Sequence, residues 1–385
     1  MDFSVSEEHE ALRRAVAKIA QDFGPAYYSR KAEAREFPTE LWQALGRYGY
    51  LGVNIPEAYG GGGAGLAELA VVCEESAAQG CPLLLMIVCN AIAAEVITAY
   101  GTEVQRRDWL PGLASGERKV VFALTEPDAG SNTHHLSTTA VRDGDGYRLN
   151  GSKYYISGVD EADAILVVAR TGAAPSSSEP ARLSLFLVDT DAPGLLAQPL
   201  PVAVALPERQ FTLFFDEVRV PADRLVGAEG DGFRQVFSGL NPERVTGAAL
   251  CVGIGRYALA RASAYAGDRT VWGAPIGSHQ GLSHPLAAAK IEVELAALMT
   301  AKAAWLHDQG RADGEAANMA KYAAAEAALA AVDIAIQCHG GNGVSTEYGL
   351  IPLWGLARLL RIAPVSREMI LNYVAQHSLG LPRSY

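Results

Sequence analysis

A serine that directly follows a glycine is the first residue in the chain whose type and setting could do chemistry. Ala129-Gly130-Ser131 lies in a turn-like stretch shortly after the apolar residues 120–122. A hydroxyl beside free backbone N–H groups suits a phosphate better than an acyl group. The same pattern is also typical of a plain turn. The local sequence therefore leaves a phosphate site and a structural turn both open.

Two glycine patterns have the spacing of a dinucleotide-binding loop. They are Gly60-x-Gly62-x-x-Gly65 and the looser Gly253-x-Gly255-x-x-Ala258. This motif works only where it follows a strand and opens a helix within a βαβ unit. Neither pattern has that context, so we do not expect a nicotinamide-binding fold.

Metal and serine-nucleophile chemistry also lack their signatures. His134 and His135 are adjacent, so in an extended segment their side chains would point in opposite directions. His279 and His284 have no carboxylate at ligand spacing. The sequence contains no G-x-S-x-G elbow. We expect no catalytic metal.

The composition predicts a folded, acidic protein. The chain has 385 residues, of which 49% are hydrophobic and 19% charged, and its formal net charge is −11. That length predicts two or three domains, and the charge argues against binding to nucleic acid or to anionic membranes. The five cysteines show no CxxC pair, and the most apolar run, residues 82–98, contains Asn90 and Glu95. We expect a soluble, cytoplasmic protein with reduced cysteines and a buried helix at that run.

The hydrophobic periodicity and composition of the sequence change twice along the chain. Residues 1–118 show helical periodicity, residues 119–226 hold short β-rich runs, and residues 227–385 are helical and rich in alanine. This order predicts an α+β protein with an N-terminal helical domain, a middle antiparallel sheet domain and a C-terminal helical domain.

Finer features of this prediction concern particular elements. Expected strands cover residues 120–122, 147–149, 164–169, 183–188 and 212–220. We expect turns at residues 143–146 and at Asn150-Gly151, and a surface loop at residues 171–180. A long helix should carry Ile291, Leu295, Leu298 and Trp305 on one face.

Several segments resemble motifs of the acyl-CoA dehydrogenase family of flavoproteins. They are Phe122-Ala-Leu-Thr-Glu-Pro-Asp-Ala-Gly-Ser131, Asn150-Gly-Ser-Lys-Tyr-Tyr-Ile-Ser157, Phe214-Phe-Asp-Glu-Val-Arg-Val-Pro221, Arg269-Thr-Val-Trp-Gly273 with His279-Gln280, and Gln337-Cys-His-Gly-Gly-Asn-Gly343. The resemblance covers essentially the whole chain, and the motifs occur in the family's order. It implies a middle β barrel or sandwich, a C-terminal four-helix bundle, and FAD bound at a subunit interface.

The resemblance also implies which residues hold FAD. Thr125 would hydrogen-bond the isoalloxazine, Ser131 would bind the pyrophosphate, and Tyr155 and Ser157 would pack against the ring. The implied cofactor residues are Phe122, Leu124, Thr125, Gly130, Ser131, Tyr155 and Ser157, then Arg269, Trp272, His279, Gln280, Gln337, Gly340 and Gly341 reaching over from a partner subunit, with Ser366 and Glu368 near the adenosine end. The alternative for Arg269 is a salt bridge at a helix end.

The family's reaction needs a base, and here the sequence departs from the commonest pattern. Many relatives carry the catalytic glutamate in a Tyr-Glu-Gly-Thr-Ser segment, whereas Pro364 occupies the corresponding position of this chain. Leu240-Asn-Pro-Glu-Arg244 resembles a subset of the family, including isovaleryl- and long-chain acyl-CoA dehydrogenases, that places the base on an earlier helix. The resemblance implies that Glu243 is the base and Arg244 a neighbouring charge. The alternative is that Glu243 is a helix N-terminal carboxylate stabilised by the dipole, since Pro242 favours a helix start.

Pro364 has a second consequence, because proline has no N–H to donate to the thioester carbonyl. We expect either that the next amide, Val365, takes over this role or that a ribityl hydroxyl of FAD works nearly alone. The implied substrate contacts are Ser131, Asn241, Arg244 and Val365, with Asn241 at the pantetheine arm.

The resemblance predicts α,β-dehydrogenation of an acyl-CoA to the trans-2-enoyl product, with an electron-transferring flavoprotein as the electron acceptor. Three alternatives stay open: an acyl-carrier-protein substrate, an oxidase or monooxygenase that uses oxygen directly, and a degenerate, non-enzymatic partner subunit. The acyl chain itself is not predicted. A residue that reaches a neighbour's cofactor requires at least a dimer, and the family is usually a dimer of dimers.

Overall fold

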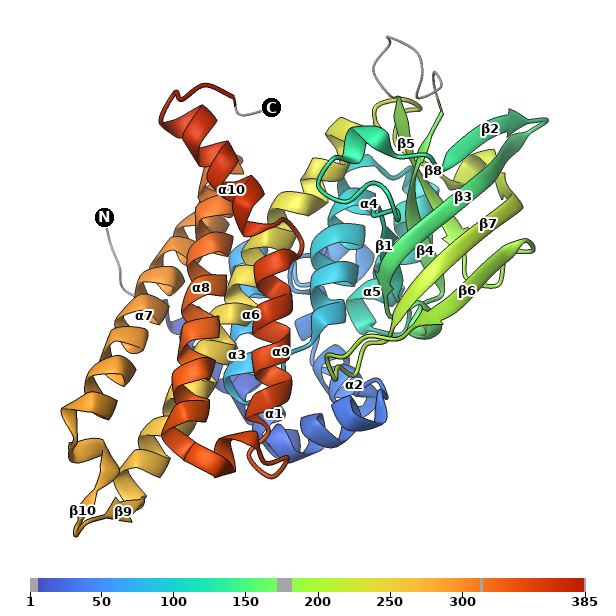
Figure 1. The fold of residues 1–385 in the computed structure, drawn as a ribbon. Helices are drawn as coiled ribbons and strands as arrows, with labels where there is room; N and C mark the ends of the chain where they lie inside the picture. The colour runs from blue at the N-terminus through green and yellow to red at the C-terminus, as the bar shows by residue number, and fades with distance from the viewer. Residues whose placement is uncertain (1–5, 172–181, 312–313, 384–385) are drawn as a thin grey trace.

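The computed structural model describes residues 6–171, 182–311 and 314–383 (Figure 1). Helices come first, a sheet follows, and helices close the chain, so the predicted helical–β–helical order is confirmed. The exact domain boundaries at residues 118 and 226 stay predictions.

The N-terminal part is a cluster of helices held by side-chain caps. Ser6 accepts a hydrogen bond from the His9 amide at the start of α1, and Thr102 with Gln105 forms a capping box at α5. The elements are α1 (Glu7–Ala34), α2 (Thr39–Arg47), η1 (Tyr50–Gly52), η2 (Glu57–Tyr59), α3 (Leu66–Ala78), η3 (Met86–Ala94), α4 (Glu95–Tyr100) and α5 (Glu103–Ser115).

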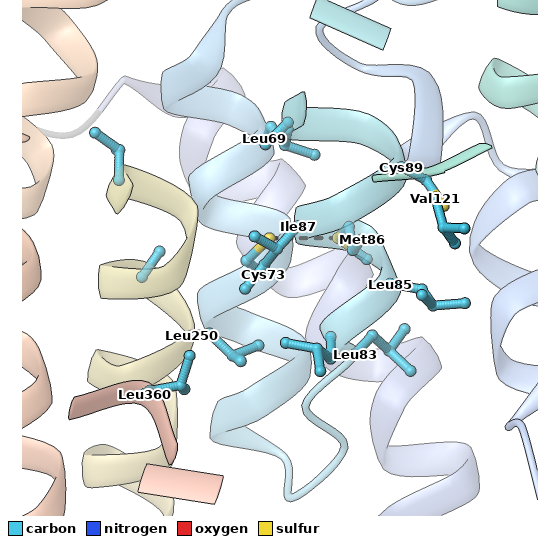
Figure 2. Packing of buried hydrophobic residues seen from close by; sticks show 14 of the residues in the cluster. Leu69, Cys73, Leu83, Leu85, Met86, Ile87, Cys89, Val121, Leu250 and Leu360 are labelled. Atoms are coloured by element: carbon cyan, nitrogen blue, oxygen red, sulfur yellow. Dashed lines mark hydrogen bonds between the residues drawn. The ribbon is translucent and has the colours of Figure 1, made fainter. Parts of the chain in front are cut away.

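The apolar run at residues 82–98 forms the centre of this part. Its middle is the π-helical segment η3, which packs against α6 and β1. Figure 2 shows Leu83, Leu85 and Met86 in this layer, with Leu250 of α6 nearby. The prediction of a buried helix is confirmed. No described helix is long and apolar enough to cross a membrane.

The middle part is one eight-stranded sheet. Its strands are β1 (Val120–Ala123), β2 (Thr139–Asp143), β3 (Gly146–Ser157), β4 (Ala164–Arg170), β5 (Leu183–Asp189), β6 (Leu195–Leu200), β7 (Gln210–Pro221) and β8 (Leu225–Val226), with 3-10 turns η4 (Thr133–His135), η5 (Val159–Glu161) and η6 (Ala222–Arg224). The order is β6-β7-β3-β2-β4-β5-β8, and β1 also pairs with β4. The five strands expected from the sequence are present, whereas β2, β6 and β8 were missed. The barrel or sandwich form stays a prediction.

Two details of the sheet prediction are wrong. Strand β4 pairs in parallel with both β1 and β2, so the sheet is not wholly antiparallel. Asn150-Gly151 is not a turn but lies inside β3, where the register against β7 shifts beside Gly151. Gly151 has φ +140°, and a Cβ there would approach Thr138 to 2.7 Å, so this glycine serves a bulge. The turn at residues 143–146 is confirmed, and the loop predicted at 171–180 lies, except for Thr171, outside the described residues.

The C-terminal part is built from long helices. Its elements are α6 (Gly232–Asp268), β9 (Thr270–Val271), β10 (Ala274–Pro275), η7 (Ile276–Ser278), α7 (Gln280–Asp308), α8 (Gly314–His339), η8 (Gly340–Val344), α9 (Leu350–Ile362), α10 (Arg367–Tyr373) and η9 (Val374–Ser378). Helix α8 packs against α6, α7 and α9. The hairpin β9–β10 lies at the end of this bundle that is farthest from the sheet (Figure 1).

The alternative in which a helix starts at Pro242 and Glu243 lies at its N-terminus is wrong. Helix α6 begins at Gly232 and continues through Pro242. Proline removes one helical hydrogen bond, but α3, α7, α8 and η3 pack along α6 and hold it in one piece. Glu243 therefore lies about three turns inside the helix and not at its N-terminus.

Candidate active site

The loop after β1, which carries the first motif, is fastened from inside the sheet. Lys153 of β3 is fully buried, and its ammonium donates to the Leu124 carbonyl at 2.9 Å and pairs with the Glu126 carboxylate at 2.9 Å. Glu126 also accepts hydrogen bonds from the Ser137 hydroxyl at 2.7 Å and the Thr138 amide at 3.0 Å. These contacts tie both ends of the loop to the sheet.

Lys153 and Glu126 are both ionised at neutral pH. Burial alone would raise the pKa of Glu126, but the charge of Lys153 and the hydrogen bonds lower it to about 2. Burial lowers the pKa of Lys153 to about 8, against the opposing effect of Glu126. The sequence reasoning missed Lys153, although a lysine on an otherwise apolar face of a strand could have indicated a buried ion pair.

The residues predicted to hold the flavin ring lie on this loop and on β3, which are joined by a backbone hydrogen bond. The Tyr154 amide donates to the Thr125 carbonyl at 2.8 Å, which places Thr125 beside the β3 residues Tyr155 and Ser157. Tyr155 is 55% exposed and has φ +58°, a left-handed conformation that a tyrosine rarely adopts. The Ser157 hydroxyl contacts the Gln210 side chain at 3.1 Å. An exposed aromatic ring held in a strained conformation is typical of a ligand platform.

The remaining predicted residues of this part lie at the end of β1 and on the loop that follows it. Phe122 and Leu124 are half-buried, and Gly130 and Ser131 are exposed. A Cβ built on Gly130 would meet no atom within 4 Å, so the space beside this turn is open to a ligand. All seven residues predicted from this part of the chain thus lie on β1, on the loop that follows it or on β3.

Glu243 lies half-buried on α6, next to two cationic side chains. Burial raises its pKa to about 7, while the charges of Arg244 and Lys321 act in the opposite direction. Arg244 donates to the Asn241 side-chain oxygen at 2.6 Å. Its Nε atom is buried and has no acceptor within the described chain. One face of α6 therefore offers a carboxylate with a raised pKa and an unsatisfied guanidinium donor.

The turn between α9 and α10 approaches the same region. The Ala363–Pro364 bond is cis, and the Val365 carbonyl accepts a hydrogen bond from the Lys321 ammonium at 2.6 Å. Lys321 comes from α8 and is 2% exposed. The sequence reasoning did not select Lys321, although a lysine within the alanine-rich, buried face of α8 could have been noticed.

The two residues predicted near the adenosine end have local partners on α10. The Ser366 hydroxyl accepts from the Met369 amide at 3.3 Å and caps the helix, while Glu368 is exposed and lies 3.6 Å from Arg367. Their contact with a cofactor stays a prediction.

The other predicted cofactor residues lie at the far end of the bundle. Arg269 ends α6, Trp272 is 93% exposed on the β9–β10 hairpin, and His279 and Gln280 are exposed at the start of α7 (Figure 1). The Arg269 side chain forms no ion pair with a described residue, so the helix-end salt bridge is not formed.

Gln337, Gly340 and Gly341 are exposed at the end of α8 and join this second group. Tyr265 of α6 links the two segments, since its ring stacks on His339 with ring centroids 4.3 Å apart and its hydroxyl oxygen accepts a hydrogen bond from the Asn342 side-chain amide at 3.1 Å. The 26 residues of α6 that separate Glu243 from Arg269 correspond to about 39 Å of helix. Within one chain, Glu243 and the predicted cofactor residues at the far end of the bundle are therefore not brought together.

The structure has three parts: a helical domain, a sheet domain with an exposed aromatic residue, and a domain of long helices that carries a carboxylate. This arrangement defines the three-domain class of flavoprotein that the motifs suggested. Three family models match in chain order. They are the N-terminal (residues 6–117), middle (residues 121–218) and C-terminal (residues 230–379) domains of acyl-CoA dehydrogenase.

Whole-chain relatives agree with these matches. "Acyl-CoA dehydrogenase FadE12" of Mycobacterium tuberculosis is 56% identical over 385 residues, covering 100% of this chain and 99% of the relative. A glutaryl-CoA dehydrogenase from Mycobacterium smegmatis, solved with FADH2, is 26% identical with a TM-score of 0.91, covering 99% of this chain and 96% of that one. A structure described as the electron transferring flavoprotein of Acidaminococcus fermentans is 29% identical with a TM-score of 0.92, covering 98% and 100%.

The chain belongs to the acyl-CoA dehydrogenase family. It is an oxidoreductase that uses FAD to dehydrogenate an acyl-CoA. The exposed Tyr155, the open turn at Gly130 and the exposed Ser131 fit this cofactor, because they offer a stacking surface, free space and a hydrogen-bond donor. When bound, FAD supplies the two-electron oxidant that this dehydrogenation requires.

Proposed function

We propose that Glu243 is the base that takes the α-proton from the acyl-CoA thioester, and that the β-hydrogen would leave as a hydride to the flavin of FAD, which together give the trans-2-enoyl product. The observation that supports this most is the raised pKa of the Glu243 carboxyl, about 7, on a face of α6 that also carries an unsatisfied buried donor of Arg244. A base works best when its pKa lies near the operating pH, and desolvation tunes the carboxyl toward that value.

Two alternatives to Glu243 as the base lose support: a purely structural role at a helix N-terminus, and a base at the later position. A helix dipole acts on charges within the first turn, and Glu243 lies about three turns inside α6. No carboxylate occupies the later position used by many relatives, because Pro364 stands there. This chain would therefore belong to the subset with its base on the earlier helix.

The thioester carbonyl needs a donor that Pro364 does not provide. The Val365 amide is the next N–H along the turn, and the hydrogen bond from Lys321 to the Val365 carbonyl restricts that residue. Losing one donor of this kind costs roughly 2.7–4 kcal/mol in the transition state, so we propose that Val365 replaces it. A complex with an unreactive thioester in which the Val365 N–H does not approach the carbonyl oxygen would contradict this assignment.

The base is tested by anaerobic mixing of purified protein with a panel of acyl-CoA thioesters while the flavin absorbance is followed. Glu243→Gln should stay yellow and folded but should not bleach. Glu95→Gln is the matched control, because burial also raises the pKa of Glu95 to about 7 and this residue has no proposed role. Bleaching of Glu243→Gln at the rate of the Glu95→Gln variant would refute the proposal.

We also propose that each FAD is completed by a partner subunit. Residues of the second group lie about 39 Å along α6 from Glu243, and α7 exposes an apolar stripe, Ile291, Leu295, Leu298 and Trp305, each more than half exposed. An apolar stripe of this size on a helix is typical of an interface. A dimer of dimers would cover both features.

A subunit-mixing experiment separates contact within a chain from contact between chains. Glu243→Gln and Arg269→Ala should each be inactive alone. Co-expressed and reassembled, they should recover activity, because the subunit with an intact Glu243 receives an intact Arg269 from its partner. No recovery in hybrids shown to contain both chains would contradict binding across the interface.

The electron acceptor is proposed to be an electron-transferring flavoprotein, supported by the similarity to the Acidaminococcus structure of that description. Turnover should depend on this acceptor and consume no oxygen. Stoichiometric oxygen uptake would favour an oxidase instead.

A further inference from the structure

Lys321 is a buried cation that connects the turn at Val365 with the helix carrying Glu243. Its side chain is 2% exposed, and its ammonium donates to the Val365 carbonyl at 2.6 Å. Burying an ammonium without an opposite charge is unfavourable by several kcal/mol. A lysine at such a place therefore needs an explanation beyond packing.

Among the described residues whose charges act most on Lys321, one acid can balance it. Glu326, on the same helix, is already paired with Arg361 at 2.5 Å and with Arg367 at 3.1 Å. Burial raises the pKa of the Cys251 thiol on α6 to about 12, so this thiol is neutral at physiological pH. Arg244 of α6 carries the same sign of charge as Lys321 and opposes it. The remaining acid is Glu243.

We infer that Lys321 is a positioning residue for proton abstraction: it fixes the Val365 turn through the carbonyl and places a positive charge beside Glu243. The inference rests on the proposed role of Glu243 as the base. One ammonium would then set both the geometry of the residue that polarises the thioester and the proton affinity of the group that attacks it.

The inference has two separable consequences. Without the charge of Lys321, the Glu243 carboxylate loses a stabilising neighbour and should become ionised only at higher pH. Each pH unit of that displacement lowers the ionised fraction about tenfold at lower pH. Without the hydrogen bond, the Val365 turn loses its anchor, and this effect should persist at high pH where Glu243 is fully ionised.

Lys321→Met and Lys321→Arg are the informative variants. Methionine has a similar length and suits a buried site, and replacing a buried charge by an apolar side chain is often tolerated. Arginine keeps the positive charge and can still donate to the Val365 carbonyl. Lys18→Met removes a lysine from the exposed face of α1 and controls for the change in net charge.

The first readout needs no turnover. Infrared difference spectra of the holoenzyme, compared with Glu243→Gln, isolate the carboxyl band of Glu243 and give its titration midpoint. The midpoint should move to higher pH in Lys321→Met and stay in place in Lys321→Arg and Lys18→Met. The second readout is anaerobic flavin reduction above that midpoint, which should remain slower in Lys321→Met alone.

The inference is overturned if the midpoint of Lys321→Met equals that of the wild type, or if its rate at high pH recovers fully. A failure of the proposed function looks different. In that case Glu243→Gln bleaches with substrate, whatever the titration of the Lys321 variants shows.

Discussion

Replacing Glu243 by glutamine should stabilise the folded enzyme at neutral pH while it removes activity. Burial raises the pKa of this carboxyl from its usual 4.5 to about 7. Folding therefore favours the protonated form, and the free energy of unfolding falls as the pH rises from about 4.5 through 7. Glutamine stays neutral throughout, so the variant avoids this loss.

The size of the effect follows from the two pKa values. Each pH unit between them is worth about 1.36 kcal/mol, which gives roughly 3 kcal/mol above pH 7. Glu243 keeps some contact with solvent, so this figure is an upper limit. For a chain of 385 residues, the entropy of unfolding translates 3 kcal/mol into a Tm increase of about 4 °C.

Thermal unfolding of the FAD-loaded wild type and Glu243→Gln between pH 4 and pH 8 measures this difference. The two Tm values should coincide at pH 4 and separate as the pH rises. Glu95→Gln should gain stability in the same pH range but retain flavin reduction. A Glu243→Gln variant whose Tm is lower than the wild type at pH 8, or higher by the same amount at every pH, would refute the reasoning.

Three further outcomes are expected. The rate of anaerobic flavin reduction should rise with pH around a midpoint near 7, because Glu243 must be ionised; a flat profile from pH 6 to pH 8 would disagree. Lys153→Met should lower the free energy of unfolding by about 3–5 kcal/mol, since it leaves the buried Glu126 charge unpaired, and Lys153→Met/Glu126→Gln should recover part of it, as measured by denaturant titration. Leu295→Asp should reduce the oligomer size seen by light scattering; an unchanged mass would contradict the α7 interface.

Much of the fold could be predicted from the sequence, because hydrophobic periodicity indicates the type and position of long helices and strands. The apolar run at residues 82–98 predicted a buried helix, and the β-rich runs located the major strands. The errors concern positions where tertiary packing overrides a local signal. Pro242 favours a helix start but lies inside α6, and Gly151 follows Asn150 as in a hairpin turn but forms a bulge in β3.

The candidate site shows a similar division. Motif resemblance selected Thr125, Tyr155 and Ser157, which the structure places on the loop after β1 and on β3, joined by the hydrogen bond from the Tyr154 amide to the Thr125 carbonyl. It did not select Lys153 or Lys321, because each acts through a backbone carbonyl of a residue distant in sequence. Such contacts produce no characteristic residue spacing in the sequence. The sequence shows only a lysine within an apolar stretch, and its role can be inferred only once the structure shows which carbonyl it contacts.

The separation of the two groups of cofactor residues is a consequence of helix length. A continuous helix from Gly232 to Asp268 carries Arg269 away from Glu243 by its rise per residue alone. The sequence predicted a helical part here, and only the alternative with a helix start at Pro242 would have made this helix shorter. The complete α6 explains why the predicted cofactor residues near Arg269 lie far from Glu243 within one chain.

Exchange of the substrate's α-protons with solvent tests the central claim most directly. A thioester such as 3,3-dimethylbutanoyl-CoA has α-hydrogens but none on its β-carbon, so oxidation is blocked while proton removal remains. In deuterium oxide the wild-type enzyme should introduce deuterium at the α-carbon, as seen by mass spectrometry, and Glu243→Gln should not. Equal exchange by the two proteins would show that another group removes the proton.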